Sequence, residues 1–179
     1  KIVELGISRT FQNIRIYKQL SVLDNVRISL DQKVNYSTLD AIFRTKKFRD
    51  TESKLTQKAL EYLKMFDLES MANNRADSLS YGNQRKLEIA RALACNPKLL
   101  LLDEPAAGMN PNETQELMDI IRNIRDNMGI SILLIEHDMD LVMGICEKLY
   151  VLNFGEIIAK GNPLEIQNNS EVIKAYLGD

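Results

Sequence analysis

The chain has 179 residues, 45% hydrophobic and 27% charged, which fits one ordinary globular domain. Its formal net charge of −2 gives no electrostatic basis for nucleic-acid binding, and a lone histidine with two widely spaced cysteines argues against a zinc site. The apolar runs are too short to span a membrane, and the start at Lys1 shows neither a signal peptide nor an initiator methionine, so we expect the chain to begin inside a larger protein.

The N-terminal half predicts one strand followed by helices. Apolar and polar residues alternate at the end of 1–12, which favours a short strand. Ser21 and Asp24 have capping-box spacing and predict a helix to Leu30, whereas 31–48 fit either a short helix or a loop. Helical spacing continues over 50–66 and 81–94, with a connector at 73–77. Because 22–94 carry no strand signal, we expect a helical insertion beside a sheet.

Strands and helices then alternate. Two apolar runs, 99–103 and 130–135, predict buried strands, and such runs separated by helices favour a parallel sheet covered on both faces. Asn110, Pro111 and Glu113 have the pattern of a helix start, and Gly129 ends that helix. The remaining predictions are a helix over 139–148, a hairpin of 149–153 and 156–160, and short helices from Pro163 and Ser170.

Two acids, Asp103 and Glu104, close the first apolar strand. Ligands of open α/β sheets lie beyond the carboxyl ends of strands, where an Asp can hold Mg²⁺ and a Glu can polarise an attacking water. The alternative is that the acids only mark where a buried strand meets solvent. Gln12 ends the first predicted strand and can reach a metal or water through its amide, or it is an exposed polar residue.

The turn at Ser80 and Gly82 opens the helix of 81–94. A helix N-terminus binds phosphate, and a glycine there lets phosphate approach the backbone. The alternative for Ser80 is an ordinary N-cap. His137 follows the second apolar strand and can hydrogen-bond a phosphate, or it is a surface histidine among acids.

Other polar residues have plainer interpretations. The capping pattern explains Asn110 without any chemistry. A solvated or salt-bridged helix face is the default for Arg85, Lys86 and Arg91, and the cluster at Lys46 and Lys47 is solvated or faces a partner.

The motifs together resemble the ATP-binding-cassette (ABC) ATPases over essentially the whole chain. In chain order, Gln12 matches the Q-loop, Leu79-Ser80-Tyr81-Gly82-Asn83-Gln84 the signature L-S-G-G-Q (Tyr81 and Asn83 depart from it), Leu99–Asp103 the Walker B strand, Glu104 the catalytic glutamate, 106–110 the D-loop (with Asn110 in place of aspartate) and His137 the H-loop. No G-x-x-x-x-G-K-[ST] occurs in these residues.

Four segments resemble one subfamily more closely, the ATPases of branched-chain amino-acid importers: Arg9–Asn13, Leu79–Gly82, Ala106–Pro111 and Ile135–Met139. The ending from Val172 to Gly178 agrees with that subfamily. Cassettes for urea or amide uptake and for lipopolysaccharide export share this ending and remain alternatives for the transported substrate.

The resemblance implies an α/β fold: a P-loop NTPase (RecA-like) parallel-sheet core with an α-helical signature subdomain. It implies that 1–179 form the C-terminal portion of one nucleotide-binding domain, with the helical subdomain at about 15–95 and the Walker B and H-loop core at about 96–179. It also implies ATP as substrate and Mg²⁺ as cofactor. The implied site comprises Glu104 and His137 as catalytic residues, Asp103 and Gln12 at the metal, and Gln12, Ser80, Tyr81, Gly82, Asn83, Gln84 and Asp103 at the nucleotide.

The implied partners are a second ATP-binding subunit, whose ATP the signature motif would contact in trans, and the transmembrane permease subunits. The segment 14–17 and the helices up to Phe66 are the candidates for permease contact. The implied location is peripheral, on the cytoplasmic face of the plasma membrane. Because these residues lack the phosphate-cradling loop, we expect this stretch alone to bind MgATP poorly and to be inactive.

Two functions of other classes compete with a transporter ATPase. One is an interaction surface without catalysis, against which the Asp103–Glu104 pair and His137 argue. The other is a cassette that acts on DNA or ribosomes, against which the net charge and the lack of a second cassette or coiled coil argue.

Overall fold

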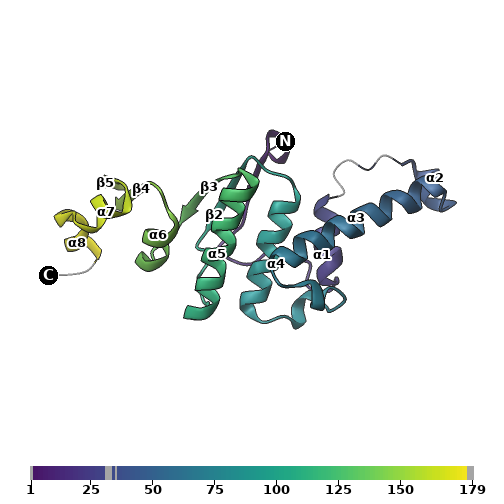
Figure 1. The fold of residues 1–179 in the computed structure, drawn as a ribbon, viewed down its shortest axis with the longest axis horizontal. Helices are drawn as coiled ribbons and strands as arrows, with labels where there is room; N and C mark the ends of the chain where they lie inside the picture. Colours follow the sequence, from purple (N-terminus) through teal and green to yellow (C-terminus); the bar gives the residue numbers. More distant parts are fainter. Residues whose placement is uncertain (1, 31–33, 35, 177–179) are drawn as a thin grey trace. The chain divides into compact units, whose positions relative to one another are not determined.

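The computed structural model describes residues 2–30, 34 and 36–176 (Figure 1). The chain divides into two compact units, Lys1–Ile135 and Glu136–Asp179, and each has its own architecture. Among the described residues, no helix combines the length and the apolar character needed to cross a membrane.

A three-stranded parallel sheet lies in the first unit. Its order is β1 (Ile7–Arg9), β2 (Leu99–Asp103) and β3 (Ser131–Ile135). Arg9 pairs with Leu101, which in turn pairs with Leu133. The predicted strands are therefore confirmed, although the first is shorter than expected. The carboxyl ends of β1 and β2 meet at one edge of the sheet.

The expected burial of the strands is only partly met. In β2, Leu100 and Leu102 are buried, whereas the alternate residues are half-buried. The prediction of a buried strand at 130–135 is wrong for β3, because Leu133 is 56% and Ile135 58% exposed. The central strand β2 has a neighbour on each side, whereas β3 is an edge strand, and its alternate side chains point to different faces.

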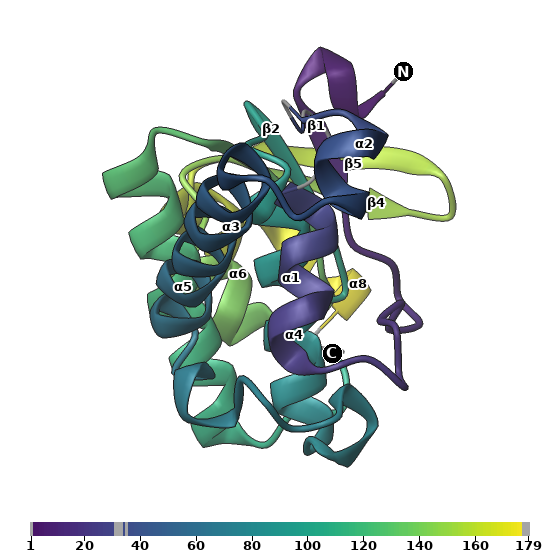
Figure 2. The same ribbon diagram turned by 90° about the vertical axis from the view of Figure 1, so that its right-hand side faces the viewer.

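Helices fill the rest of the first unit, as Figure 2 shows for α1, α3 and α4. In chain order they are η1 (Val3–Leu5), α1 (Val22–Leu30), α2 (Thr38–Ile42), α3 (Lys46–Met65), η3 (Glu69–Met71), η4 (Ala76–Ser78), α4 (Tyr81–Ala94) and α5 (Pro111–Met128). No strand occurs among the described residues of 22–94, which confirms the helical insertion.

The caps of these helices explain where they begin. Ser21 Oγ accepts from the Asp24 amide at 2.9 Å, as predicted from the capping spacing. Thr45 caps α3, so that helix begins before the predicted residue 50. Packing of α1 against α3 and α4 buries Val22, Val26, Leu63 and Leu87 completely and forms the core of this helical part.

The second unit is a small helix and hairpin assembly. It contains α6 (Met139–Ile145), β4 (Leu149–Asn153), β5 (Glu156–Gly161), α7 (Pro163–Gln167) and α8 (Ser170–Tyr176). The hairpin turns at Phe154 and Gly155, both of positive φ, which is the type I′ geometry that matches strand twist. Ala159, Ile166 and Val172 form its core. Contrary to the prediction, α6 ends at Ile145, because Cys146 is extended.

Candidate functional site

The candidate residues of β1 and β2 meet at the carboxyl edge of the sheet. Gln12 Nε2 donates to Glu104 Oε2 at 2.9 Å, and Arg9 Nη2 donates to Asp103 Oδ2 at 2.7 Å. Thr10, which is fully buried, accepts the Asp103 amide at 3.4 Å through its hydroxyl. The structure thus brings Gln12 together with both acids at this edge of the sheet.

Glu104 has an unusual backbone. Its φ is +44°, in the left-handed region that residues with a Cβ rarely adopt, and its amide donates to the Ile135 carbonyl at 2.9 Å. Such a conformation costs on the order of 1–3 kcal/mol and is typical of functional positions. Nothing in the sequence pattern signals this strain.

A segment without helix or strand, residues 11–17, leads from β1 toward α1 and appears as a purple trace in Figure 2. Side chains of α4 hold its backbone. Arg85 donates to the carbonyls of Phe11 and Gln12 at 2.7 Å each, and Glu88 accepts the Arg15 amide at 2.9 Å. The glutamine of the candidate site is therefore anchored to α4.

Arg85 and Glu88 form a buried ion pair at 2.8 Å, with side-chain exposures of 0% and 5%. Lys86 is also buried and bonds Glu116 of α5 at 2.6 Å. The prediction of a solvated face is therefore wrong for Arg85 and Lys86, although the salt-bridged alternative is correct. Residues 85–90 are all buried, so this part of α4 has no solvent face, and no pattern in its own sequence signals that.

Arg91 continues the same helix face. Its guanidinium lies 4.6 Å from the centroid of the Tyr17 ring and donates to the Arg15 carbonyl. Burial lowers the pKa of Arg91, while Tyr17 opposes that shift. Arg85, Glu88 and Arg91 are spaced three residues apart on α4, and together they contact the segment of residues 11–17 from its first residue to its last.

Phe11 lies among cations at the start of that segment. The guanidinium of Arg15 is 4.0 Å and that of Arg9 is 5.2 Å from the centroid of its ring. Both distances fit cation–π contacts. Because Arg9 also binds Asp103, the ring contributes to the orientation of the strand-end charges.

The signature segment occupies the start of α4. Ser80 is the N-cap and accepts the Asn83 amide at 3.3 Å, so the capping alternative holds, while Gln84 Nε2 donates to the Leu79 carbonyl at 3.0 Å. A Cβ on Gly82 would lie 2.5 Å from Glu113 Oε1, and one on Gly108 would lie 3.1 Å from the Tyr81 ring. The glycine of this segment therefore gives room to the Glu113 carboxylate.

Asn110 caps α5 as its pattern predicted. Its Oδ1 accepts the amides of Asn112 and Glu113 at 3.0 and 3.1 Å, and Glu113 Oε2 accepts the Asn110 amide at 3.0 Å. This reciprocal arrangement satisfies backbone donors at the helix start.

His137 belongs to the second unit, just before α6. Its side chain is 71% exposed, and Nδ1 lies 3.8 Å from Glu136 Oε2. Asp138 is the N-cap of α6, so the acids beside the histidine have structural roles as well.

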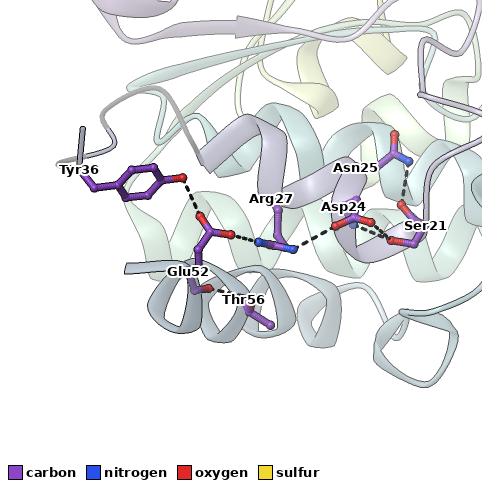
Figure 3. A network of polar contacts seen from close by, with 7 residues as sticks. All are labelled: Ser21, Asp24, Asn25, Arg27, Tyr36, Glu52 and Thr56. Carbon is purple, nitrogen blue, oxygen red and sulfur yellow. Dashed lines mark hydrogen bonds and ion pairs between the residues drawn. The ribbon is translucent and has the colours of Figure 1, made fainter. Parts of the chain in front are cut away.

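A second polar network links α1 to α3 (Figure 3). Arg27 joins Asp24 of its own helix to Glu52 of α3, and Glu52 accepts the Tyr36 hydroxyl at 2.9 Å.

Asn25 of α1 is fully buried and bonds the backbone of Tyr17. It donates to the Tyr17 carbonyl at 3.0 Å and accepts the Tyr17 amide at 2.8 Å. The segment of residues 11–17 is therefore bonded to α1 as well as to α4.

Known families and relatives show to which protein family the chain belongs. Residues 1–107 match the ABC transporter family, and residues 156–179 match the family described as branched-chain amino acid ATP-binding cassette transporter. The branched-chain amino acid transport ATP-binding protein LivG of Salmonella typhimurium is 43% identical over 179 residues, all of this chain and 70% of LivG. The lipopolysaccharide export ATP-binding protein LptB of Escherichia coli is more distant, with 34% identity over 97% of this chain and 66% of LptB.

Solved structures agree with that assignment. The ADP conformation of the cassette MJ1267 has a TM-score of 0.79 at 31% identity and covers 99% of this chain and 70% of MJ1267. A dimeric cassette, MJ0796 bound to ADP and Pi, has a TM-score of 0.71 at 26% identity, covering 88% of this chain and 63% of MJ0796. The chain belongs to the ABC transporter family, with its P-loop NTPase fold. It is an ATPase that energises a transporter.

Proposed function

We propose that the edge formed by β1 and β2 is where this ATPase activates water, with Glu104 as the group that polarises it. The observation that carries this proposal is the hydrogen bond of 2.9 Å from Gln12 to Glu104 at two adjacent strand ends, together with the strained backbone of Glu104. His137 contacts the γ-phosphate in the proposed arrangement, and Gln12 senses the nucleotide.

Asp103 and Gln12 would hold Mg²⁺, which supplies charge neutralisation at the phosphates when bound. Mg²⁺ needs oxygen ligands and keeps several waters, so one carboxylate and one amide oxygen suffice. These ligands fit the ion. Gln12 donates to Glu104 through its amide nitrogen, so the amide oxygen is the atom that would face the metal, and Asp103 lies on the neighbouring strand end. The described residues contain no group of three or more acidic, histidine or cysteine side chains that could hold a metal ion.

The residues Ser80, Tyr81, Gly82, Asn83 and Gln84 at the start of α4 would contact an ATP held by a second copy or a related subunit. A helix N-terminus presents free amides and roughly half a positive charge to a phosphate. The dimeric cassette MJ0796 supports a paired arrangement.

The transported substrate is proposed to be a branched-chain amino acid. The identity to LivG and the match of 156–179 support import of these amino acids over lipopolysaccharide export, given the lower identity to LptB. Urea or amide import remains the second candidate through the shared C-terminal ending.

Permease subunits are the proposed partners, and the cytoplasmic face of the plasma membrane is the proposed location. Three large apolar side chains around α2, Leu39, Ile42 and Phe43, are 65–75% exposed and fit an apolar protein partner. The segment 14–17 is a second candidate contact. Residues of about 15–95 and about 96–179 are the proposed helical and core subdomains.

Replacing Glu104 with glutamine tests the catalytic role. Glu104→Gln keeps the shape and the bond from Gln12 but removes the negative charge, so we expect ATP turnover to fall by at least about 10²-fold while nucleotide-driven dimers persist. Turnover and dimer formation are measured on the intact subunit that carries this chain. Glu69→Gln, on an exposed turn, is the control and should keep the wild-type rate. A Glu104→Gln variant with the wild-type rate would refute the role.

Uptake by the reconstituted transporter tests the substrate. Radiolabelled leucine, urea and a short-chain amide are offered to vesicles loaded with ATP. Leucine accumulation that Glu104→Gln abolishes supports the proposal, and accumulation of urea or amide alone would replace it by the second candidate.

A further inference from the structure

The backbone of residues 11–17 is held by side chains instead of by a ladder or a helix. Polar groups of Phe11, Gln12, Arg15 and Tyr17 all bond side chains of α4 or α1. Exposed loops ordinarily rely on their own turns or on water for these bonds. The main chain at these four residues is therefore bonded to α4 and α1.

The holder nearest the site is Arg85. Its Nη1 donates to the Phe11 carbonyl and to Glu88, and its Nη2 donates to the Gln12 carbonyl. Glu88 completes the arrangement by accepting the Arg15 amide. Because the ion pair is buried, water does not readily replace the bond between Arg85 and Glu88, whereas the bonds to Phe11, Gln12 and Arg15 are part-buried.

We propose that Arg85, held by Glu88, is the positioning residue that fixes the main chain of Gln12 to the signature helix α4 and so sets where the Gln12 amide meets Glu104. Arg85 fixes the main chain of Gln12, and Gln12 touches Glu104 through its side chain. Arg85 thereby acts on the proposed water-polarising group without touching it. This inference rests on the proposed roles of Gln12 and Glu104.

The chemistry of the guanidinium explains why a lysine cannot replace it. Arginine presents several donors in a planar fork, whereas lysine carries one ammonium on a flexible stem. Arg85→Lys keeps a cation beside Glu88, so no buried charge is left alone, but one ammonium nitrogen replaces the two nitrogens, Nη1 and Nη2, that donate to the carbonyls of Phe11 and Gln12.

Steady-state ATPase kinetics of the intact subunit test the proposal. For Arg85→Lys we expect kcat to fall between about tenfold and a hundredfold, the cost of misplacing a group by about 1 Å, with KM for ATP unchanged. Arg75→Lys is the matched control, because Arg75 also forms a forked pair, with Asp77, but on the surface. An unchanged kcat, or a rise in KM alone, would overturn the proposal.

A double-mutant cycle shows whether Arg85 acts through Gln12. If it does, Arg85→Lys lowers kcat in the wild-type background but has almost no further effect in a Gln12→Ala background. Multiplicative losses in the two backgrounds would mean that Arg85 acts by another route, and the proposal would fall.

Hydrogen exchange separates this inference from the proposed function. In the unmodified protein the Arg15 amide should exchange as slowly as amides of α4, and in Arg85→Lys at least about tenfold faster, with α5 unchanged. Slow exchange in a protein without ATPase activity would overturn the function but keep the positioning by α4. Fast exchange of Arg15 in the unmodified protein would overturn the inference, even if Arg85→Lys fails to fold.

Discussion

Helices α4 and α5 carry the same kind of ion pair in opposite surroundings. The pair of Arg85 and Glu88 is spaced i, i+3 and excluded from solvent, whereas Asp119 and Arg122 have the same spacing with side chains 63% and 37% exposed. Exposed pairs contribute little to stability, whereas removal of one partner from a buried pair is strongly destabilising. Charge spacing alone therefore does not distinguish a solvated helix face from a buried anchor.

Removing the acid of each ion pair should have very different effects on the stability of the two helices. Glu88→Ala leaves the Arg85 cation buried without its partner, so we expect the free energy of unfolding to fall by roughly 3–5 kcal/mol. Denaturant titration of the protein measures the loss. Asp119→Ala is the matched change on α5 and should cost no more than about 1 kcal/mol. Equal losses for the two variants would mean that burial does not distinguish the pairs.

The cap of α5 offers an intermediate effect. Asn110 accepts two backbone amides, so Asn110→Ala should lower the free energy of unfolding by roughly 1 kcal/mol. The same titration measures it, with Asn112→Ala, two residues later and exposed, as the control. A loss no larger than that of the control would show that the cap contributes little and that packing stabilises the start of α5.

The smallest expected effect lies at the exposed C-terminal part of α5. The hydrogen bond from Arg125 lowers the pKa of Asp126 below its usual 3.8, and the nearby charge of Arg122 contributes less. A carboxylate with a lowered pKa stabilises the fold above its unfolded pKa, and this stabilisation disappears as pH falls through the folded pKa. NMR titration should find the Asp126 midpoint raised in Arg125→Gln and raised less in Arg122→Gln. A midpoint that neither change moves would contradict the assigned cause.

Some features of this molecule were predictable because they depend on neighbouring residues. The spacing of Ser21 and Asp24, and of Asn110 and Glu113, is a local signal, and both caps are present. The apolar run ending in Asp103 and Glu104 likewise predicts where the strand ends. The family motifs added the expectation that Gln12 and these acids share a site.

Other features depend on contacts between distant parts of the chain. The burial of Arg85 follows from its bonds to Phe11 and Gln12, more than seventy positions away. The exposure of β3 follows from its place at the edge of the sheet, and the left-handed Glu104 from its bond to Ile135. No periodicity of a single segment records such contacts.

The side-chain anchoring of residues 11–17 has a consequence for protein engineering. A conventional loop carries its own turn residues and can be grafted between homologous scaffolds as one piece. Here the shape of the loop of residues 11–17 depends on side chains outside it: Asn25, Arg85, Glu88 and Arg91 hydrogen-bond its backbone. A chimera that imports the loop must import these four residues as a set, and a chimera that replaces the helices must replace the loop with them.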